Sequence, residues 1–216
     1  MGRFKSIIFD FDGTLADSHR GIVTAYQETF RRLGLEIPSE EFITSTIGLT
    51  LEDGFKAMDR KLTDEDACRA ANLYRKIFPE IAYPMITAFP GVVEILSGLY
   101  EQGYLMAVAS SRSHVSLEDL AEQVGVARFF RALFGAEDVE NHKPAPDMVK
   151  LVLDRFGLDP DEVLVVGDAN YDLMMGQGAG CHVCGISWGN QSREQLEAVH
   201  PDYVIDSIDE LPCCLY

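Results

Sequence analysis

The sequence is poor in positive charge. Its 216 residues include 18 Lys and Arg against 35 Asp and Glu, which gives a formal net charge of -17 at pH 7. Proteins that bind nucleic acid owe much of their affinity to clustered Lys and Arg beside the phosphate backbone. The imbalance therefore argues against nucleic acid as a main partner, although a small anionic substrate can still bind in a pocket that is locally positive.

Cysteines and long apolar runs are also scarce. The chain has five cysteines, an odd number that fits a reducing compartment better than a disulfide framework, so we expect a cytoplasmic protein. Cys181 and Cys184 have CxxC spacing, but no second pair completes a four-ligand zinc site, and we expect this segment to be part of a strand. No apolar run approaches the roughly 18 residues that a membrane-spanning helix needs, so we expect no membrane partner.

What the sequence does contain is a series of short apolar runs, each ending in small or acidic residues. They cover residues 6–10, 104–111, 162–168 and 182–189. Continuous apolar runs of this length are typical of strands buried on both faces, as in a parallel sheet covered by helices. Helical patterns occur at residues 91–101, 116–124, 147–156 and 172–178. The alternation predicts an α/β fold with a doubly wound, Rossmann-like parallel sheet.

The interval between the first two runs departs from this alternation. It contains no convincing strand but several amphipathic helical stretches, one of which begins with Thr63 or Asp64 as a capping residue. This is far more chain than a crossover between parallel strands needs. We therefore expect an all-helical domain at residues 17–85, inserted into a core formed by residues 1–16 and 86–216.

Acidic residues gather where the predicted strands end. Asp10 and Asp12 close the first run, and their i, i+2 spacing lets both side chains point the same way. Asp168 closes the third run, and Asp172 follows at the i+4 spacing that places two residues on one face of a helix. Ligands of open α/β sheets bind beyond the carboxyl ends of the strands, so these carboxylates should converge. Their repulsion calls for a hard divalent cation, and oxygen ligands favour Mg²⁺.

Two further segments suggest what the metal serves. Ser110 and Ser111 end the second run just before a predicted helix, where hydroxyl and free N–H groups suit a phosphate. Lys143 lies in a loop stiffened by Pro144 and Pro146, and its ammonium can contact a phosphoryl oxygen. Taken singly, the serines are most often a helix cap and the lysine a solvated surface residue. Their order along the chain, each near a strand end, favours a phosphate site.

Four segments resemble, in order, the motifs of the haloacid dehalogenase-like hydrolase superfamily. They are DFDGTLADS at residues 10–18, AVASS at 107–111, HKPAPD at 142–147 and VVGDANYD at 165–172. The similarity extends over nearly the whole chain. The helical insertion looks like the first type of cap in that superfamily, as in phosphoglycolate phosphatases and β-phosphoglucomutases.

The resemblance implies roles for individual residues. Asp10 would be the nucleophile that forms an aspartyl-phosphate, and Asp12 the general acid and base. Ser110 and Lys143 would hold the transferred phosphoryl group. The ligands of Mg²⁺ would be Asp10, the backbone carbonyl of Asp12, Asp168 and, directly or through water, Asp172. Residues of the cap would choose the substrate, and the candidates are His19, Arg20, Gly48, Leu49 and Thr50.

The reaction type can be narrowed by the same resemblance. Asp12 argues for cleavage of a phosphate ester or anhydride, since dehalogenases and phosphonatases of the superfamily lack it. β-Phosphoglucomutases typically carry a histidine where this chain has Ile22, which favours hydrolysis. We therefore expect a Mg²⁺-dependent phosphoric monoester hydrolase for a small phosphorylated metabolite, most like phosphoglycolate phosphatase, as a monomer or homodimer. The alternatives are an inorganic pyrophosphatase, a nucleotidase, a β-phosphoglucomutase-type phosphotransferase and, least favoured, a non-catalytic phosphate-binding module.

Overall fold

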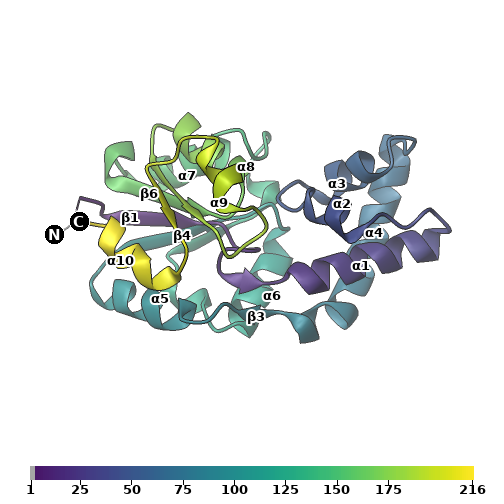
Figure 1. Cartoon of the computed structure of the whole chain (residues 1–216), viewed down its shortest axis with the longest axis horizontal. Coiled ribbons are helices and arrows are strands. Elements are labelled where there is room, and N and C mark those ends of the chain that lie inside the picture. Colours follow the sequence, from purple (N-terminus) through teal and green to yellow (C-terminus); the bar gives the residue numbers. More distant parts are fainter. Residues whose placement is uncertain (1–2) are drawn as a thin grey trace.

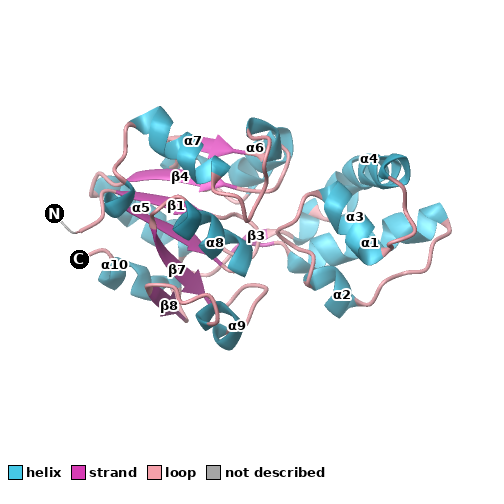
Figure 2. Cartoon of the chain, turned by 90° about the horizontal axis from the view of Figure 1, so that it is seen from above, coloured by secondary structure: helices cyan, strands magenta, loops and turns pink. Residues whose placement is uncertain are grey.

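The computed structural model describes residues 3–216 and consists of an α/β core with a group of helices at one end (Figures 1 and 2). The core contains a sheet of six parallel strands in the order β5-β4-β1-β6-β7-β8. Their bounds are β1 Ser6–Phe9, β4 Leu105–Ala109, β5 Ala132–Phe134, β6 Val163–Gly167, β7 His182–Ile186 and β8 Tyr203–Ile205. Numbered within the sheet this order is 3-2-1-4-5-6, that of the doubly wound fold, so the predicted fold class is confirmed.

Both faces of the sheet are covered, as the apolar runs predicted. Ile7 and Phe9 pack in one cluster with helices α5, α6 and α10, whereas Ile8 between them packs in a second cluster with α7, α8 and α9. Successive strand residues point to opposite faces, and here both faces are apolar. The helices are α5 Val92–Glu101, α6 His114–Gln123, α7 Asp147–Phe156, α8 Asn170–Gly178, α9 Arg193–Glu197 and α10 Leu211–Cys214.

A helical region is inserted between β1 and the core helix α5. It contains α1 His19–Leu33, α2 Glu40–Thr44, α3 Leu51–Met58 and α4 Asp64–Ile81. Its centre is aromatic: the ring centroid of Tyr26 lies 4.9 Å from that of Phe55 and 4.7 Å from that of Tyr74. Thr63 caps α4 through a capping box with Asp66, which confirms one of the two expected helix starts.

The chain enters and leaves this region through two short antiparallel strands. These are β2 Ala16–Asp17 and β3 Thr87–Ala88, in which Ala16 pairs with Ala88 and Asp17 with Thr87. In Figure 2, β3 lies at the junction of the two parts. The insertion is thus tied to the core by a two-stranded ribbon close to the expected crossing points, while the limits 17–85 stay a prediction.

Several elements differ from the sequence-based expectation. Strands β5 and β8 were not predicted, because three-residue strands give no periodic pattern, and the run at 182–189 is a strand only as far as Ile186. Cys184 lies in β7 as expected, and all five cysteines are free. Within residues 3–216, no helix has the length and apolarity to cross a membrane.

Candidate active site

The candidate site lies at the point where the strand order reverses. β1 and β6 are neighbours in the sheet. The next strand of the core after β1 is β4, on one side of this pair, whereas the next strand after β6 is β7, on the other side. Asp10 directly follows β1, and Asp168 directly follows β6. Doubly wound sheets bind ligands at this switch point, outside the carboxyl ends of the strands. A cavity of about 850 Å³ opens there, lined by core residues, including both aspartates, and by residues of the helical insertion.

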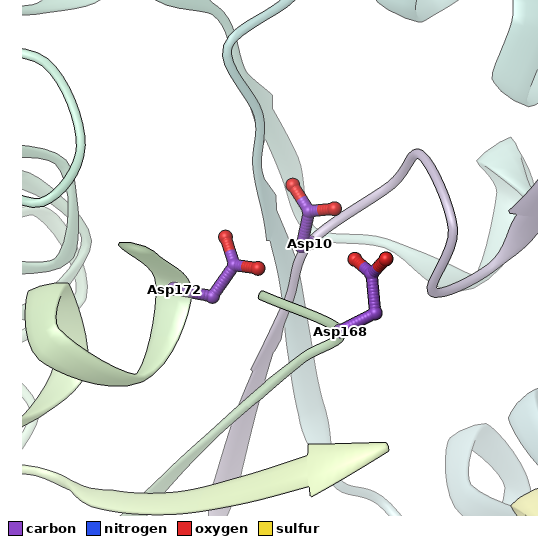
Figure 3. A group of neighbouring side chains, drawn as sticks. All are labelled: Asp10, Asp168 and Asp172. Carbon is purple, nitrogen blue, oxygen red and sulfur yellow. The ribbon is translucent and has the colours of Figure 1, made fainter. Parts of the chain in front are cut away.

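Three carboxylates converge on one point of this cavity. Asp10, Asp168 and Asp172 are buried, and each offers an oxygen within 4.8 Å of the others, as their facing side chains in Figure 3 show. Burial, together with Asp172 and Asp168, raises the pKa of Asp10 well above its usual value, although Lys143 opposes the shift. Burial and then Asp172 raise the pKa of Asp168 to about 7. The protein without metal therefore holds these groups at a cost in charge repulsion.

The convergence differs in one detail from the predicted geometry. Asp168 and Asp172 do not share a helix face, because α8 begins only at Asn170 and Asp168 lies before its capping residue, Ala169. Asp172 lies in the first turn of α8 and accepts a 3.1 Å hydrogen bond from the Ala169 N–H. The two carboxylates meet because the chain turns sharply between strand and helix.

Lys143 supplies the positive charge at the centre of the cluster. Its ammonium donates to Asp10 Oδ1 at 2.5 Å and to Asp172 Oδ1 at 2.6 Å, and its side chain is only 1% exposed. Burial lowers the pKa of Lys143, but Asp10 and Asp172 raise it more, so that it lies above the ordinary value. The lysine that sequence analysis assigned to phosphate therefore also holds the proposed nucleophile.

Glycines give these side chains the room they need. A Cβ on Gly13 would lie 2.2 Å from Asp168 Oδ2, and one on Gly189 would lie 2.3 Å from the Cβ of Asp168. A Cβ on Gly167 would lie 2.3 Å from the Cβ of Asp172. Non-bonded atoms do not approach this closely, so a side chain at any of the three positions would displace the carboxylates.

Asp168 is fixed by three hydrogen bonds. Thr14 Oγ1 donates to its Oδ1 at 3.3 Å, and the backbone N–H and side-chain amide of Asn190 donate to its Oδ2 at 2.6 and 2.7 Å. Asn190 was not among the predicted site residues. It follows β7, a strand whose carboxyl end also lies at the site, and that position is the signal that could have identified it.

Asp12 lies apart from the three-carboxylate cluster and has its own cation. Arg112 Nε lies 2.6 Å from Asp12 Oδ2, and Arg112 Nη2 donates to Oδ1 at 2.7 Å. Ser18 Oγ donates to the same Oδ1 at 2.5 Å. Arg112 was not among the predicted site residues, although it directly follows the two serines at a strand end.

The two predicted phosphate-binding serines have different surroundings. Ser110 is buried in the cavity wall, and its Oγ accepts a 3.2 Å hydrogen bond from the Arg112 N–H, while its hydroxyl proton has no acceptor among residues 3–216. Ser111 instead donates its hydroxyl proton to the backbone carbonyl of Gly48 in the insertion at 2.6 Å. The structure thus presents Ser110 to a ligand and uses Ser111 to join the two parts.

The candidates for substrate choice divide in the same way. Gly48, Leu49 and Thr50 line the cavity. His19 and Arg20 are not among its lining residues: His19 shares a 2.7 Å hydrogen bond with Thr44 between α1 and α2, and Arg20 is exposed. His19 and Arg20 lie in the first turn of α1, whereas Ile22 and Tyr26, further along that helix, line the cavity. Cavity residues that the sequence analysis missed are Tyr26, Tyr74 and Phe78, which it read only as part of helical patterns.

The donor set fits a divalent cation. Asp10, Asp168 and Asp172 carry three negative charges when ionised, and Lys143 balances one of them. A cation of charge two would balance the remainder, and carboxylate oxygens are the ligands of hard cations. Binding would also remove the repulsion that raises the pKa of Asp10 and Asp168.

Comparisons with known proteins agree with this geometry. A family model described as haloacid dehalogenase-like hydrolase matches residues 7–186. A protein named probable phosphatase IndB, from Dickeya dadantii, is 37% identical over 208 residues, covering 95% of this chain and 90% of the relative. A pyrophosphatase PpaX of Bacillus pumilus is 30% identical over 207 residues, covering 96% and 94%.

Two further proteins extend the comparison. A phosphoglycolate phosphatase of Shigella sonnei is 31% identical over 235 aligned positions, covering 98% of this chain and 93% of the relative. The crystal structure named for a haloacid dehalogenase-like hydrolase of Bacteroides fragilis superimposes with a TM-score of 0.91 at 30% identity. It covers 96% of this chain and 99% of its own.

Proposed function

The chain belongs to the haloacid dehalogenase-like hydrolase family, and we propose that it is a Mg²⁺-dependent phosphatase of a small phosphorylated metabolite, acting through an aspartyl-phosphate. The observation that carries this proposal is the setting of Asp10. Its buried carboxylate is bonded to Lys143 and lies within 4.8 Å of Asp168 and Asp172 at the cavity. A carboxylate in this setting has the cation partner and the access that a nucleophile toward phosphorus requires.

The proposed reaction has two steps. First, a carboxylate oxygen of Asp10 attacks phosphorus, the bond between phosphorus and the leaving oxygen breaks, and Asp12 gives its proton to that oxygen. Second, Asp12 takes a proton from water as the water oxygen attacks the aspartyl-phosphate. The bond from Asp10 to phosphorus then breaks, phosphate leaves and both carboxyl groups return to their starting states.

Other residues would hold the phosphoryl group. The free hydroxyl proton of Ser110 and the ammonium of Lys143 are donors for its oxygens. Asp10, Asp168 and Asp172 would hold Mg²⁺, together with the backbone carbonyl of Asp12. When bound, the metal would neutralise negative charge on the phosphoryl group.

Residues 17–85 are proposed to act as a cap over the site. Gly48, Leu49 and Thr50 bring the insertion to the cavity wall, which supports their assignment as residues that contact the leaving group. The cavity of about 850 Å³ leaves room beyond a phosphate for a small organic group. We propose a phosphate monoester such as 2-phosphoglycolate as the first substrate to test.

Pyrophosphate is the second candidate. The relative named pyrophosphatase PpaX is similar over 96% of this chain, at 30% identity. The same two steps would cleave an anhydride, with phosphate as both the leaving group and the final product.

The test is phosphate release from 2-phosphoglycolate, pyrophosphate, a sugar phosphate and a nucleoside monophosphate, with Mg²⁺ and with a chelator. We expect Mg²⁺-dependent turnover of at least one compound, reduced about 10³-fold or more in Asp10→Asn. Asp154→Asn, on the exposed face of α7, is the matched control and should behave as wild type. Absence of turnover with all four compounds, or full activity in Asp10→Asn, would contradict the proposal.

A further inference from the structure

Arg112 lies between the core, the helical insertion and the proposed general acid, and it has no role in the steps above. Its side chain is 10% exposed, and its guanidinium contacts Asp12 from the core and the ring of Phe78 from α4. The distance from the guanidinium carbon to the centroid of that ring is 4.8 Å. We propose that Arg112 is a positioning residue, which orients the carboxyl group of Asp12 for proton transfer while the insertion packs against it.

The hydrogen bonds to Asp12 distinguish its two oxygens. Oδ1 accepts from both Ser18 Oγ and Arg112 Nη2, at 2.5 and 2.7 Å. Oδ2 lies 2.6 Å from Arg112 Nε, but the angle makes no hydrogen bond, and Nε is a buried donor without a partner among residues 3–216. Oδ1 is therefore the anchored oxygen, and Oδ2 is the one that can exchange a proton with a substrate.

Arg112 is itself held firmly by the core. Its backbone N–H donates to Ser110 Oγ, and its carbonyl accepts from the Ala136 N–H at 2.7 Å. Nη1 donates to Ser116 Oγ at 3.1 Å. The guanidinium is therefore fixed in place, and its Nη2 donor, together with the hydroxyl of Ser18, sets the orientation of the Asp12 carboxyl group.

The contact with Phe78 links this arrangement to the insertion. Phe78 stacks on Tyr74 with ring centroids 5.2 Å apart, so it is part of the aromatic centre of the inserted helices. Ser111, next to Arg112, donates a hydrogen bond to the backbone carbonyl of Gly48, which is also part of the helical insertion. A displaced insertion would remove the ring from one face of the guanidinium and admit water to the ion pair.

Stability alone does not account for such an ion pair. Removing two charges from water costs free energy that their mutual attraction often fails to recover, so a buried ion pair is weak evidence of net stabilisation. Arg128 stacks on Phe129 at the same 4.8 Å but is exposed, away from the cavity. Arg112 differs in having a carboxylate of the site as its partner.

The inference rests on the proposed phosphatase mechanism, and its test compares two leaving groups. p-Nitrophenolate leaves phosphorus without a proton, whereas the alkoxide of an alkyl phosphate needs one. The value of kcat/KM reports the steps up to leaving-group departure, so it is measured for p-nitrophenyl phosphate and for the alkyl phosphate of the panel that is cleaved fastest. The variants are Arg112→Gln, Arg112→Lys and Phe78→Leu, with Arg128→Gln as the matched control.

We expect Arg112→Gln to lose about 10- to 100-fold in kcat/KM on the alkyl ester, which is part of the roughly 10²- to 10⁴-fold that general acid catalysis contributes, and less than about threefold on the aryl ester. Arg112→Lys should lose nearly as much, since one ammonium does not reproduce the planar guanidinium that donates to Ser116 through Nη1 and to Asp12 through Nη2. Phe78→Leu should lose less kcat/KM than the Arg112 variants, but the loss should again be larger on the alkyl ester than on the aryl ester. This variant still tests the inference if the Arg112 variants do not fold. Arg128→Gln should match wild type.

Equal losses on both esters would assign Arg112 to substrate binding and overturn the inference. Full activity of Arg112→Lys would also overturn it, because charge without geometry would then suffice. If wild type cleaves both esters but the ratio is unchanged in the variants, only this inference fails. If wild type cleaves neither ester nor any compound of the panel, the proposed function fails as well.

Discussion

The hydroxyl of Ser111 donates a 2.6 Å hydrogen bond to the carbonyl of Gly48, 63 positions away in the sequence. Gly48 belongs to the helical insertion and Ser111 follows a core strand, so this bond joins the two parts beside the cavity. A hydroxyl has one proton to donate. In this arrangement Ser111 cannot also donate to phosphate, whereas Ser110 can.

Replacing the two serines should therefore have different effects. Ser111→Ala removes one hydrogen bond worth about 1 kcal/mol, so we expect KM to rise about fivefold with kcat nearly unchanged, as the insertion packs less firmly on the core. Ser110→Ala should lower kcat/KM about 10- to 100-fold, because a hydrogen-bond donor to the charged phosphoryl group is lost. Steady-state kinetics on the best substrate checks both. Equal losses in kcat/KM would show that Ser111 also binds phosphate.

Removing the ammonium of Lys143 should destabilise the protein without metal. Lys143→Met leaves Asp10 and Asp172 without their buried cation, and breaking a buried ion pair costs about 3 kcal/mol or more. Urea denaturation in a chelator measures the free energy of unfolding. Lys150→Met, on the exposed face of α7, is the matched control and should change stability by less than about 0.5 kcal/mol. An unchanged stability of Lys143→Met would contradict this account of the cluster.

Gly13→Ala, compared with a second glycine variant, separates backbone strain from displacement of Asp168, a proposed ligand of Mg²⁺. Gly13 has φ of +82°, and an added Cβ would lie 2.2 Å from Asp168 Oδ2. Gly157 has φ of +64°, but a Cβ added there would meet no heavy atom of residues 3–216 within 4 Å beyond its chain neighbours. Gly157→Ala therefore carries a similar backbone strain of about 1 kcal/mol without the clash. Mg²⁺ titration by calorimetry should show that Gly13→Ala binds Mg²⁺ at least about tenfold more weakly than wild type, whereas Gly157→Ala binds it as wild type does. Equal affinities would show that Asp168 does not bind the metal.

The pKa of Asp168 predicts how stability depends on pH. Its value rises from 3.8 to about 7 on folding, so the folded state binds the proton more tightly than the unfolded chain. In a chelator, the free energy of unfolding that depends on the protonation of Asp168 is therefore highest below about pH 4, and it falls as pH rises through 7. The loss is at most about 4 kcal/mol.

Denaturation between pH 5 and 8 checks this sign. The decline should be smaller in Asp168→Asn, which cannot ionise, and saturating Mg²⁺ should reverse it, because a cation favours the ionised carboxylates. A decline that is the same in Asp168→Asn would assign the effect to the general negative charge of the protein instead.

Much of the core could be predicted because its signals are local. The runs around Ile8 and Val165 are apolar on both faces, which only a covered sheet accommodates, and α7 has the bounds that its pattern predicted. Thr63 begins α4 because its side chain caps the first turn. Strand β5, by contrast, has three residues and forms because Ala132, Leu133 and Phe134 pair with β4, which is a contact between distant segments.

In the candidate site, too, some features have local signals in the sequence, whereas others depend on contacts between distant segments. The convergence of Asp10, Ser110 and Asp168 could be predicted from the sequence, since each follows a parallel strand and the carboxyl ends of such strands share one edge of the sheet. The sequence did not determine that Arg112 pairs with Asp12, that Ser111 bonds Gly48 or that His19 turns toward Thr44. The first lies within the core, the second joins the insertion to the core, and the third lies within the insertion. All three are contacts between segments distant in the sequence, and such side-chain contacts leave no periodic pattern in it. They follow only from the packing of the folded chain, which also sets which of the predicted residues line the cavity.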